Sequence, residues 1–452
     1  MNKKHVDILN QYKKENRLLH WHWEEVRTER EERYLRGTPE GSEIERQRSV
    51  VDVDFYLKVT VNLPNSDQGT YRGKLSSLDN FESTLNGFIE KAKVSKERSW
   101  PIDQWEEPEA IPAVKPYDQK IIENPGGVAD ELVNEFNQEI QQVQSSTFNS
   151  AEIFVSSVER FVRASNRFSD LSKATRVYAE VCFSSLDTPD YDSQEFVVTK
   201  WGVHRDQIHP QQMCKDSVVN CNHLAKAEKM PSGKYSVLVG SEVLAMVFAD
   251  VVSQMNVKRK YLSLPFLEVG TFLVNQSEGE YGLALDPTLP YGLQTTIYDS
   301  WGNLQQPVTL CSDNRVIHNI VDKQYGHYLD KKTTSHRGNI RLDAKKATPV
   351  EDLRKADGLV VEILQLSGLF TDPNTLTFSS EIRLAKVYDN TSGKVFYAKG
   401  GNLSGSFKEN TRQLRLSKEQ GDEHIVHFTT PGSGVSYFGP KWGLLNDVSV
   451  TS

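Results

Sequence analysis

The residues with the most obvious chemical potential lie between positions 204 and 223. Imidazole and thiolate groups are common zinc ligands, and this segment carries five of them: His204, His209, Cys214, Cys221 and His223. Their spacing matches no compact zinc module, and Cys221 and His223 would point to opposite faces of a strand or across a helix. Two interpretations stay open, a divergent metal site or a polar connecting segment with incidental cysteines.

A second candidate is Asp250, which lies in the most continuously apolar stretch of the chain, residues 235–256. A carboxylate in such surroundings needs a partner or a raised pKa. It is either an acid that faces a cleft or a carboxylate paired with a basic residue such as Lys258 or Arg259. The neighbouring sequence offers no second acid or base to form a catalytic pair with it.

The elements that position Asp250 are predicted to be a strand and a helix. The strand covers 235–239 and runs through Gly240 into a helix that begins at Ser241 and continues to about 256. The sequence contains no Walker A loop, no GxGxxG after a strand, no GxSxG elbow and no HExxH.

Upstream, the N-terminal part is predicted to open with a helix and to continue with strands at 31–36, 43–48 and 52–61. The last of these alternates apolar and polar residues, as a half-buried strand does. A helix follows at about 78–95, with Asp79 as its expected N-cap.

Two short patterns in this part carry further expectations. In HWHW (20–23), period-two alternation predicts buried tryptophans and exposed histidines. The charge run EEVRTEREERYLR (24–36) is predicted to be a solvated strand or helix edge.

The middle of the chain combines one long amphipathic helix with strands. The helix is predicted over 128–144, because its apolar residues recur at steps of three and four. Strands are predicted at 151–166, 174–186 and 195–203. Beyond residue 233 the signals are mostly those of β-strands and hairpin turns, including a strand at 271–276.

These patterns predict an α+β protein, with antiparallel strands and long helices in the N-terminal part and a mostly β C-terminal domain. The expected division is an N-terminal α+β domain (1–100), a proline-rich linker (101–117), a middle α+β region (118–232) and the β-rich C-terminal domain (233–452).

Composition narrows the functional classes. The chain has 452 residues and a net charge of -8, which gives no reason to expect nucleic-acid binding. Apolar runs are too short for a signal peptide or a membrane span. The cysteines are few and scattered, so we expect reduced thiols and a cytoplasmic location.

Four blocks carry a resemblance to a known family. GKYSVLVGSEVLAMVFADVVSQ (233–254) is similar to the start of the C-terminal domain of the TldD/PmbA family. DPTLPYG (286–292) resembles that family's most distinctive block, and HRGNIRL (336–342) and GGNL (400–403) follow in the family order. The resemblance covers about 233–430, and upstream it extends only to the order of the elements.

The resemblance implies a peptidase fold that lacks its metal site. In the TldD-like branch the helix corresponding to 241–256 carries HExxxH, whose histidines bind zinc and whose glutamate helps to activate a water. The matching window here is Ala249-Asp250-Val251-Val252-Ser253-Gln254, so alanine and glutamine replace both imidazoles. The TldD-like branch also uses a C-terminal cysteine, and this chain has none after Cys311.

A PmbA/TldE-like, non-catalytic subunit is therefore implied, with no cofactor of its own and zinc only in a TldD-like partner. Members of this kind are associated with modulation of DNA gyrase and with peptide maturation. The expected partners are a TldD-like metallopeptidase subunit or a second copy of this chain, together with an unfolded or precursor peptide. Apolar runs at 316–321 and 359–366 are expected to supply the contact, unless they fill the chain's own core. The alternative function is a self-sufficient peptidase with a divergent metal site.

Overall fold

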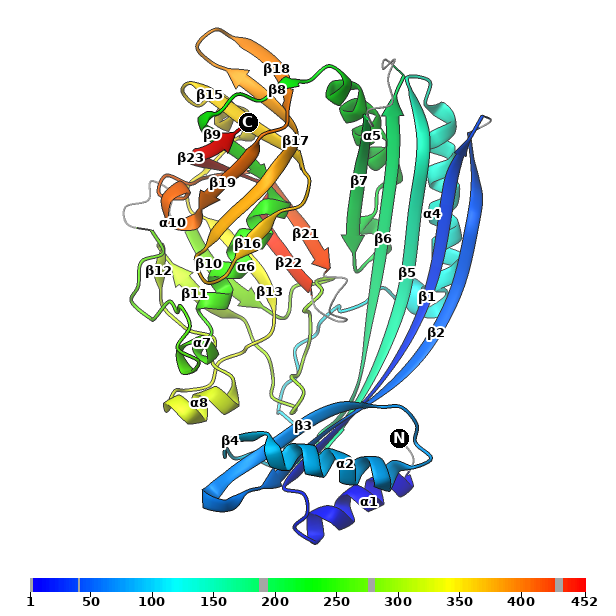
Figure 1. Cartoon of the computed structure of the whole chain (residues 1–452), viewed down its shortest axis with the longest axis vertical. Helices are drawn as coiled ribbons and strands as arrows, with labels where there is room; N and C mark the ends of the chain where they lie inside the picture. The colour runs from blue at the N-terminus through cyan, green and yellow to red at the C-terminus, as the bar shows by residue number, and fades with distance from the viewer. Residues whose placement is uncertain (1–2, 40, 187–193, 275–280, 427–433) are drawn as a thin grey trace.

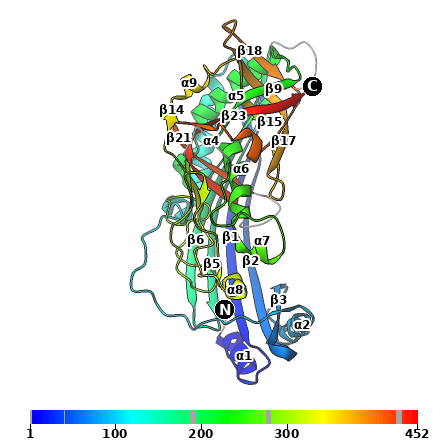
Figure 2. The same ribbon diagram turned by 90° about the vertical axis from the view of Figure 1, so that its left-hand side faces the viewer.

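The computed structural model describes residues 3–39, 41–186, 194–274, 281–426 and 434–452, and it has two parts (Figure 1). Long antiparallel strands with helices packed on them form the first part, and a mostly β region forms the second. The α+β fold class predicted from the sequence is confirmed. Figure 2 shows that the long strands β1, β2, β5 and β6 run along the long axis of the molecule.

A seven-stranded antiparallel sheet with the order β4-β3-β2-β1-β5-β6-β7 organises the first part. Its strands are β1 (His20–Thr38), β2 (Gly41–Asn62), β3 (Asp67–Leu75), β4 (Lys96–Arg98), β5 (Ser146–Ala164), β6 (Ser169–Ser185) and β7 (Glu195–Gly202). The predicted strands at 43–48 and 52–61 are parts of the single strand β2. Because β1 pairs with β5, one continuous sheet runs through both 1–100 and 118–232.

The charge run at 24–36 lies inside this sheet, so the prediction of a solvated edge is wrong. β1 has β2 on one side and β5 on the other, and Glu31, Glu32 and Arg33 are all buried. They are buried as ion pairs: the Arg33 guanidinium contacts Glu31 at 3.0 Å and Asp130 at 2.8 Å. Charges can occupy a central strand when each finds a partner of opposite sign.

Helices cover the sheet in both its lower and its upper half as drawn in Figure 1. The helices of the first part are α1 (Lys3–Lys14), α2 (Phe81–Val94), α3 (Gln119–Glu123), α4 (Pro125–Gln142) and α5 (Pro210–Ala225), with 3-10 turns η1 (Pro64–Ser66) and η2 (Arg205–Gln207). α4 buries the predicted apolar face on β5 and on α5. The predicted cap of α2 is wrong, because Asn80 rather than Asp79 precedes its first turn and no side chain caps it.

For the HWHW pattern, the prediction of buried tryptophans is confirmed, and the prediction of exposed histidines is wrong for His22. Trp21 and Trp23 are buried against α1 and α2, but His22 is buried as well, at 5% exposure. Its ring lies 5.4 Å from that of Trp301 in the C-terminal part. The histidine face of β1 is therefore covered by a loop more than 250 residues downstream, which a local pattern cannot reveal.

The segment 101–117 contains no helix or strand and runs along the C-terminal part. The Trp105 indole donates a hydrogen bond to the Gly302 carbonyl at 3.1 Å. Gly302 has a φ of 85°, and a Cβ there would meet the rings of Trp105 and Phe168 at 2.4 and 2.5 Å. Only glycine fits this contact.

A closed ring of five strands forms the centre of the C-terminal part. β9 pairs with β15 and β23, β17 pairs with β15, and β19 pairs with both β17 and β23, so the ring closes as a small barrel. The strands of this sheet are β8 (Glu228–Lys229), β9 (Gly233–Gly240), β14 (Ala347–Thr348), β15 (Leu359–Leu366), β16 (Phe370–Asp372), β17 (Thr377–Asp389), β18 (Lys394–Lys399), β19 (Asn402–Ser406), β20 (Arg415–Ser417) and β23 (Trp442–Thr451).

A six-stranded sheet and short helices complete this part. The sheet order is β12-β11-β10-β13-β22-β21, with β10 (Tyr281–Asp286), β11 (Val308–Ser312), β12 (Arg315–Val316), β13 (Asn339–Ala344), β21 (Gln420–Val426) and β22 (Gly434–Pro440). The helices are α6 (Ser241–Gln254), α7 (Val257–Tyr261), α8 (Lys323–Leu329), α9 (Val350–Leu353) and α10 (Phe407–Asn410).

Two expectations for this part need correction. Within the predicted strand 271–276, residues 271–274 form only an isolated bridge at Phe272, and 275–276 lie outside the described residues. The apolar runs at 316–321 and 359–366 place most of their apolar side chains in the chain's own core, with Ile317 and Leu359 exposed. This burial favours the alternative that the runs fill the chain's own core over the expected contact with a partner. Across the described ranges, no helix is both long and apolar enough to cross a membrane.

Candidate functional site

Helix α6 and the strand before it lie where the sequence predicts them. β9 leads directly into α6, and α6 packs between the barrel and the six-stranded sheet, against β9, β21 and β22. Phe248 is 1% exposed, with its ring 5.6 Å from Tyr281 and 5.5 Å from Phe407. α6 is therefore a core helix that presents only a few positions to a pocket.

The two positions that match the family histidines point to different surroundings. Ala249 lines a pocket of about 440 Å³ beside α6. Gln254 is 4% exposed, and its amide nitrogen donates to the carbonyl oxygens of Pro373 at 2.8 Å and Asn374 at 3.1 Å. Gln254 thus holds the turn after β16 and does not reach toward a shared ligand site.

Asp250 faces β16. Burial raises the pKa of its carboxyl, and the charge of Asp372 raises it further, while a hydrogen bond with Thr371 and the charge of Arg259 act in the opposite direction. Of the two basic residues predicted as partners, Arg259 is the one that favours the ionised carboxylate. Arg259 itself donates to the Pro373 carbonyl at 3.2 Å, so this corner is tied together by several polar contacts.

The pocket beside α6 has an apolar wall and a cationic side. Leu285, Ile320 and Ile340 contribute to the wall, and Lys258 and Arg259 provide the positive charges. Such a lining suits an apolar side chain that carries or adjoins a carboxylate.

The residues present do not fit the zinc that the family resemblance associates with this helix. The Ala249 side chain has no donor atom, and the Gln254 amide is used on two carbonyls. Within the described ranges, no group of three or more His, Cys, Asp or Glu side chains is arranged to hold a metal ion. One carboxylate is not enough to bind zinc at working affinity.

The segment 204–223 contains a 3-10 turn and most of helix α5. It is therefore not the polar connecting segment that one interpretation of the sequence predicted. Cys214 and Cys221 lie on the buried face of α5, in the core under the sheet, and burial raises the pKa of both thiols. His204 packs on the Tyr291 ring at 4.4 Å and His223 on the Tyr397 ring at 3.7 Å.

His209 sits at the N-terminal boundary of α5. The five candidate ligands are therefore spread over separate environments. The structure buries the two cysteines, packs His204 and His223 on tyrosine rings, leaves His209 exposed and does not bring the five together.

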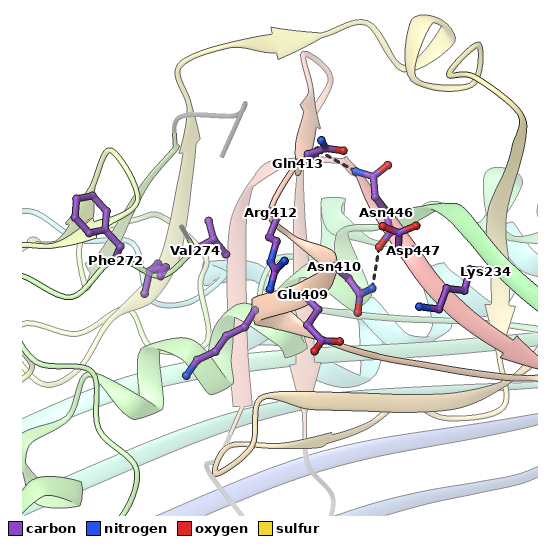
Figure 3. Close-up of a pocket in the computed structure, with 11 residues that line it drawn as sticks. Lys234, Phe272, Val274, Glu409, Asn410, Arg412, Gln413, Asn446 and Asp447 are labelled. Carbon is purple, nitrogen blue, oxygen red and sulfur yellow. Dashed lines mark hydrogen bonds between the residues drawn. The ribbon is translucent and has the colours of Figure 1, made fainter. Parts of the chain in front are cut away.

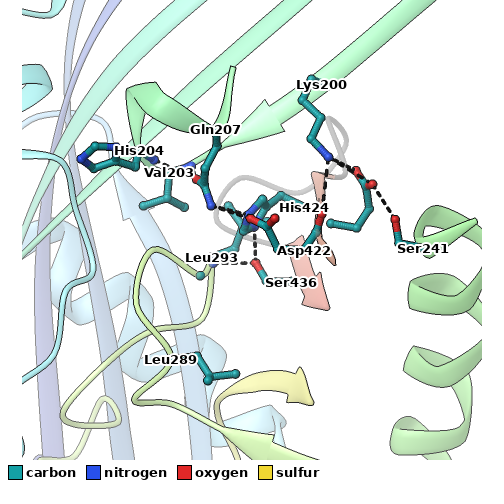
Figure 4. A network of polar contacts seen from close by, with 12 residues as sticks. Lys200, Val203, His204, Gln207, Ser241, Leu289, Leu293, Asp422, His424 and Ser436 are labelled. Atoms are coloured by element: carbon teal, nitrogen blue, oxygen red, sulfur yellow. Dashed lines mark hydrogen bonds and ion pairs between the residues drawn. The ribbon is translucent and has the colours of Figure 1, made fainter. Parts of the chain in front are cut away.

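A polar network joins α6 to the first part of the molecule (Figure 4). Lys200 on β7 forms an ion pair with Glu423 on β21 at 3.2 Å. The Ser241 hydroxyl, in the first turn of α6, donates to the same carboxylate at 3.1 Å. Glu423 therefore bridges the long sheet and the helix that carries the candidate positions.

The second half of this network is centred on His424. Its Nε2 lies 3.1 Å from Asp422 Oδ2, and its Nδ1 lies 2.7 Å from Ser436 Oγ. The Gln207 amide donates to Asp422 at 2.8 Å, and the Leu293 N–H donates to Ser436 Oγ at 2.7 Å. The network thus connects η2, β21, β22 and the loop around residue 293.

Sequence reasoning missed this cluster, although Asp422 and His424 alternate on one strand and so share a face. The residue types are those of a Ser-His-Asp triad. Ser436 and His424 are 1% and 2% exposed, so no substrate carbonyl can reach the hydroxyl. The arrangement holds the two parts of the chain together.

Replacing Asp422 with asparagine tests this role through pH. The hydrogen bond with His424 is the main cause that lowers the pKa of Asp422 to about 2 from an ordinary 3.8, so its contribution to stability is present above the ordinary value and is lost as the pH falls toward 2. Because the carboxylate is partly exposed, we expect Asp422→Asn to lower the free energy of unfolding by about 1 kcal/mol at neutral pH.

Denaturant unfolding at a series of pH values measures this effect. The difference between the wild type and Asp422→Asn should shrink as the pH falls from the ordinary pKa toward 2. Asp206→Asn, at a carboxylate with 82% of its side chain exposed, is the matched control and should change stability by less than about 0.5 kcal/mol. An equal effect of the two substitutions at neutral pH would show that the network is not stabilising.

A second pocket, of about 940 Å³, lies near α10 and the start of β9 (Figure 3). Its lining carries both signs of charge, with Lys234 and Arg412 on one hand and Glu409 and Asp447 on the other. Asn410 donates to the Asn446 carbonyl at 2.8 Å and so fixes α10 against β23. The lining is polar and mixed in charge, which suits contact with a polar segment.

Comparison with known proteins identifies the fold. No family model and no curated protein matches the sequence. The chain has the fold of solved structures of TldE and of proteins described as putative modulators of DNA gyrase, so the TldD/PmbA resemblance predicted from the sequence is confirmed at the level of the fold.

Three solved structures carry this conclusion. The chain is similar to TldE from Thermococcus kodakarensis, with a TM-score of 0.75, 14% identity and coverage of 99% of this chain and 100% of that chain. It is also similar to two proteins described as putative modulators of DNA gyrase. The one from Thermotoga maritima gives a TM-score of 0.76 at 14% identity over 99% of each chain. The one from Bacteroides thetaiotaomicron gives 0.75 at 13% identity over 99% of this chain and 98% of the other.

Proposed function

We propose that this chain is a TldE-like, non-catalytic subunit that pairs with a TldD-like metallopeptidase and helps to hold an unfolded or precursor peptide. The observation that carries the proposal is the use of the two ligand positions on α6. Ala249 offers no donor, and Gln254 is committed to the carbonyls of Pro373 and Asn374. A chain that keeps a peptidase scaffold without its metal ligands keeps it for binding.

The pocket beside α6 is the proposed contact with the peptide. Its apolar wall accommodates a side chain, and Lys258 and Arg259 attract a carboxylate. In a TldD-like partner the equivalent position would carry the zinc, which supplies the hydrolytic water there. This chain contributes shape and charge only.

The alternative, a self-sufficient peptidase with its own divergent site, has less support. Asp250 has a raised pKa, but the groups that act on it are Thr371, Asp372 and Arg259, which include no histidine or cysteine. The histidines and cysteines of 204–223 are spread over the core of the first part and its surface. The net charge of -8 likewise gives no support to a direct contact with DNA. A cytoplasmic location stays a prediction, in keeping with the buried free thiols of all four cysteines.

Association with a partner tests the proposal. Mixed with a TldD-like homologue that has an intact HExxxH motif, the chain is expected to form a complex containing both proteins, because the scaffold is retained for assembly. Light scattering coupled to size exclusion measures the mass. A mass for this chain that does not change when the homologue is added would contradict the partner hypothesis.

A further inference from the structure

Over much of its length, β2 has a neighbouring strand on one side only within the described chain, which leaves its other edge free. β2 pairs with β1 along its length, but β3 pairs only with residues 55–62. Residues 41–54 therefore leave one row of backbone N–H and C=O groups open, and most of this stretch is exposed. In Figure 1 this is the outer upper half of β2. Such an edge is a template for another strand.

The charges on this edge are arranged by sign. Arg46, Arg48, Asp52 and Asp54 alternate with other residues and so share one face of the sheet, with Val50 between the two kinds. An edge protected against association usually carries charges that repel an incoming strand. Within 46–54 one end of the edge is cationic and the other is anionic, which is self-complementary for an antiparallel copy. Glu43 and Glu45 lie outside this stretch, beside Arg36.

We propose that two copies of this chain pair edge to edge through β2, antiparallel and with the two-fold axis at Val50. In this register Arg46 lies opposite Asp54 of the second copy and Arg48 lies opposite Asp52, and the symmetry repeats both pairs. Opposed charges on paired strands stabilise a sheet. The pairing continues the sheet of one copy into that of the other.

The lower limit of the pairing follows from β3. Phe55 is already paired with Leu75, so the second copy can extend only as far as Asp54, which is the last residue that this register uses. With the axis at Ser49, only Arg46 and Asp52 face each other across the two copies, and with the axis at Val51, only Arg48 and Asp54 do. Moving it to Arg48 or Asp52 places like charges opposite each other.

Contacts that these side chains already make within the chain decide which pair to test. Arg48 is 3.6 Å from Glu32, which is already 2.7 Å from Arg30, and Asp54 is 2.6 Å from Lys74. Asp52 is exposed and has no ion pair within the described chain. Arg48 and Asp52 are therefore the pair whose exchange least disturbs the fold.

The experiment is a charge exchange followed by sedimentation velocity over a concentration series. The wild-type chain is expected to self-associate, and added salt should weaken the association because the pairs are exposed. Arg48→Asp and Asp52→Arg should each weaken it about tenfold or more, since each places like charges opposite each other twice. The double variant Arg48→Asp/Asp52→Arg, and an equimolar mixture of the two single variants, should restore it.

The control is Arg27→Asp on β1, which changes the net charge equally at a side chain with the same 46% exposure. It should leave the association unchanged. Restoration by the double variant also rules out loss of folding as the cause of the weakening.

Cysteine cross-linking checks the register. The four native cysteines are buried, so Val50→Cys introduces an accessible thiol at the two-fold axis, and oxidation should join two copies. Ser49→Cys, whose symmetric equivalents are offset, should cross-link poorly. A chain that remains a monomer, a dimer indifferent to the exchange, or an edge that captures unfolded peptide and not a second copy would overturn the proposal. The proposal does not depend on the function of α6.

Discussion

Purified chain incubated with an unfolded protein substrate and added zinc is expected to release no peptides above the rate of buffer alone. In the proposed role the hydrolytic metal belongs to a TldD-like partner, because a metallopeptidase needs a metal that generates a nucleophilic water and has an open coordination position. On α6 the first ligand position is Ala249, and the second, Gln254, donates to two carbonyls. Neither can bind zinc without changing the residue or breaking the turn after β16.

The assay needs three comparisons. A chelator and the variant Asp250→Asn should both leave the background rate unchanged, and elemental analysis after dialysis should find no stoichiometric zinc. A TldD-like homologue with an intact HExxxH motif serves as the positive control for the substrate. Chelator-sensitive cleavage by this chain alone, lost in Asp250→Asn, would replace the proposed role with a self-sufficient peptidase.

Truncating Phe248 to alanine is expected to lower the free energy of unfolding by about 3–5 kcal/mol. The side chain is 1% exposed and packs edge-on against Tyr281 of β10 and Phe407 of α10. Its removal leaves a cavity where α6, the barrel and the six-stranded sheet meet. Because α6 joins both sheets, relaxation around the cavity is restricted.

Denaturant unfolding followed by near-ultraviolet circular dichroism measures this effect. Phe370→Ala is the matched control, because that ring is 75% exposed, and it should change stability by less than about 0.5 kcal/mol. A loss below about 1 kcal/mol for Phe248→Ala would mean that α6 is not a central packing element.

Local patterns were sufficient where an element is defined by its own residues. The strand and helix at 235–254 and the amphipathic helix α4 are found where their periodicities place them. Local patterns failed where the burial of a residue depends on a neighbour that is far away in the sequence. The charged residues of β1 become interior because β5 pairs with them from more than 100 residues away, and His22 is buried by the loop at Trp301.

The same limit applies to the candidate site. The family resemblance assigned the positions 249 and 254 by their spacing along one helix, and their match to the family histidines stays a prediction. The network at His424 could not be predicted, because it needs the register that places His424 opposite Ser436 and the approach of Gln207 from the first part.

The closed ring of the barrel also constrains how the chain is made. β9 receives one neighbour, β15, from within the following 130 residues, but its other neighbour is β23, which ends at Thr451. During synthesis the first part can pair all its strands as soon as residue 202 has left the ribosome. The open edge of β9 must then wait while the remainder of the chain is translated. A nascent chain stalled before residue 442 would leave that edge of β9 unpaired. The C-terminal part is therefore the part of the protein that most needs a chaperone during synthesis.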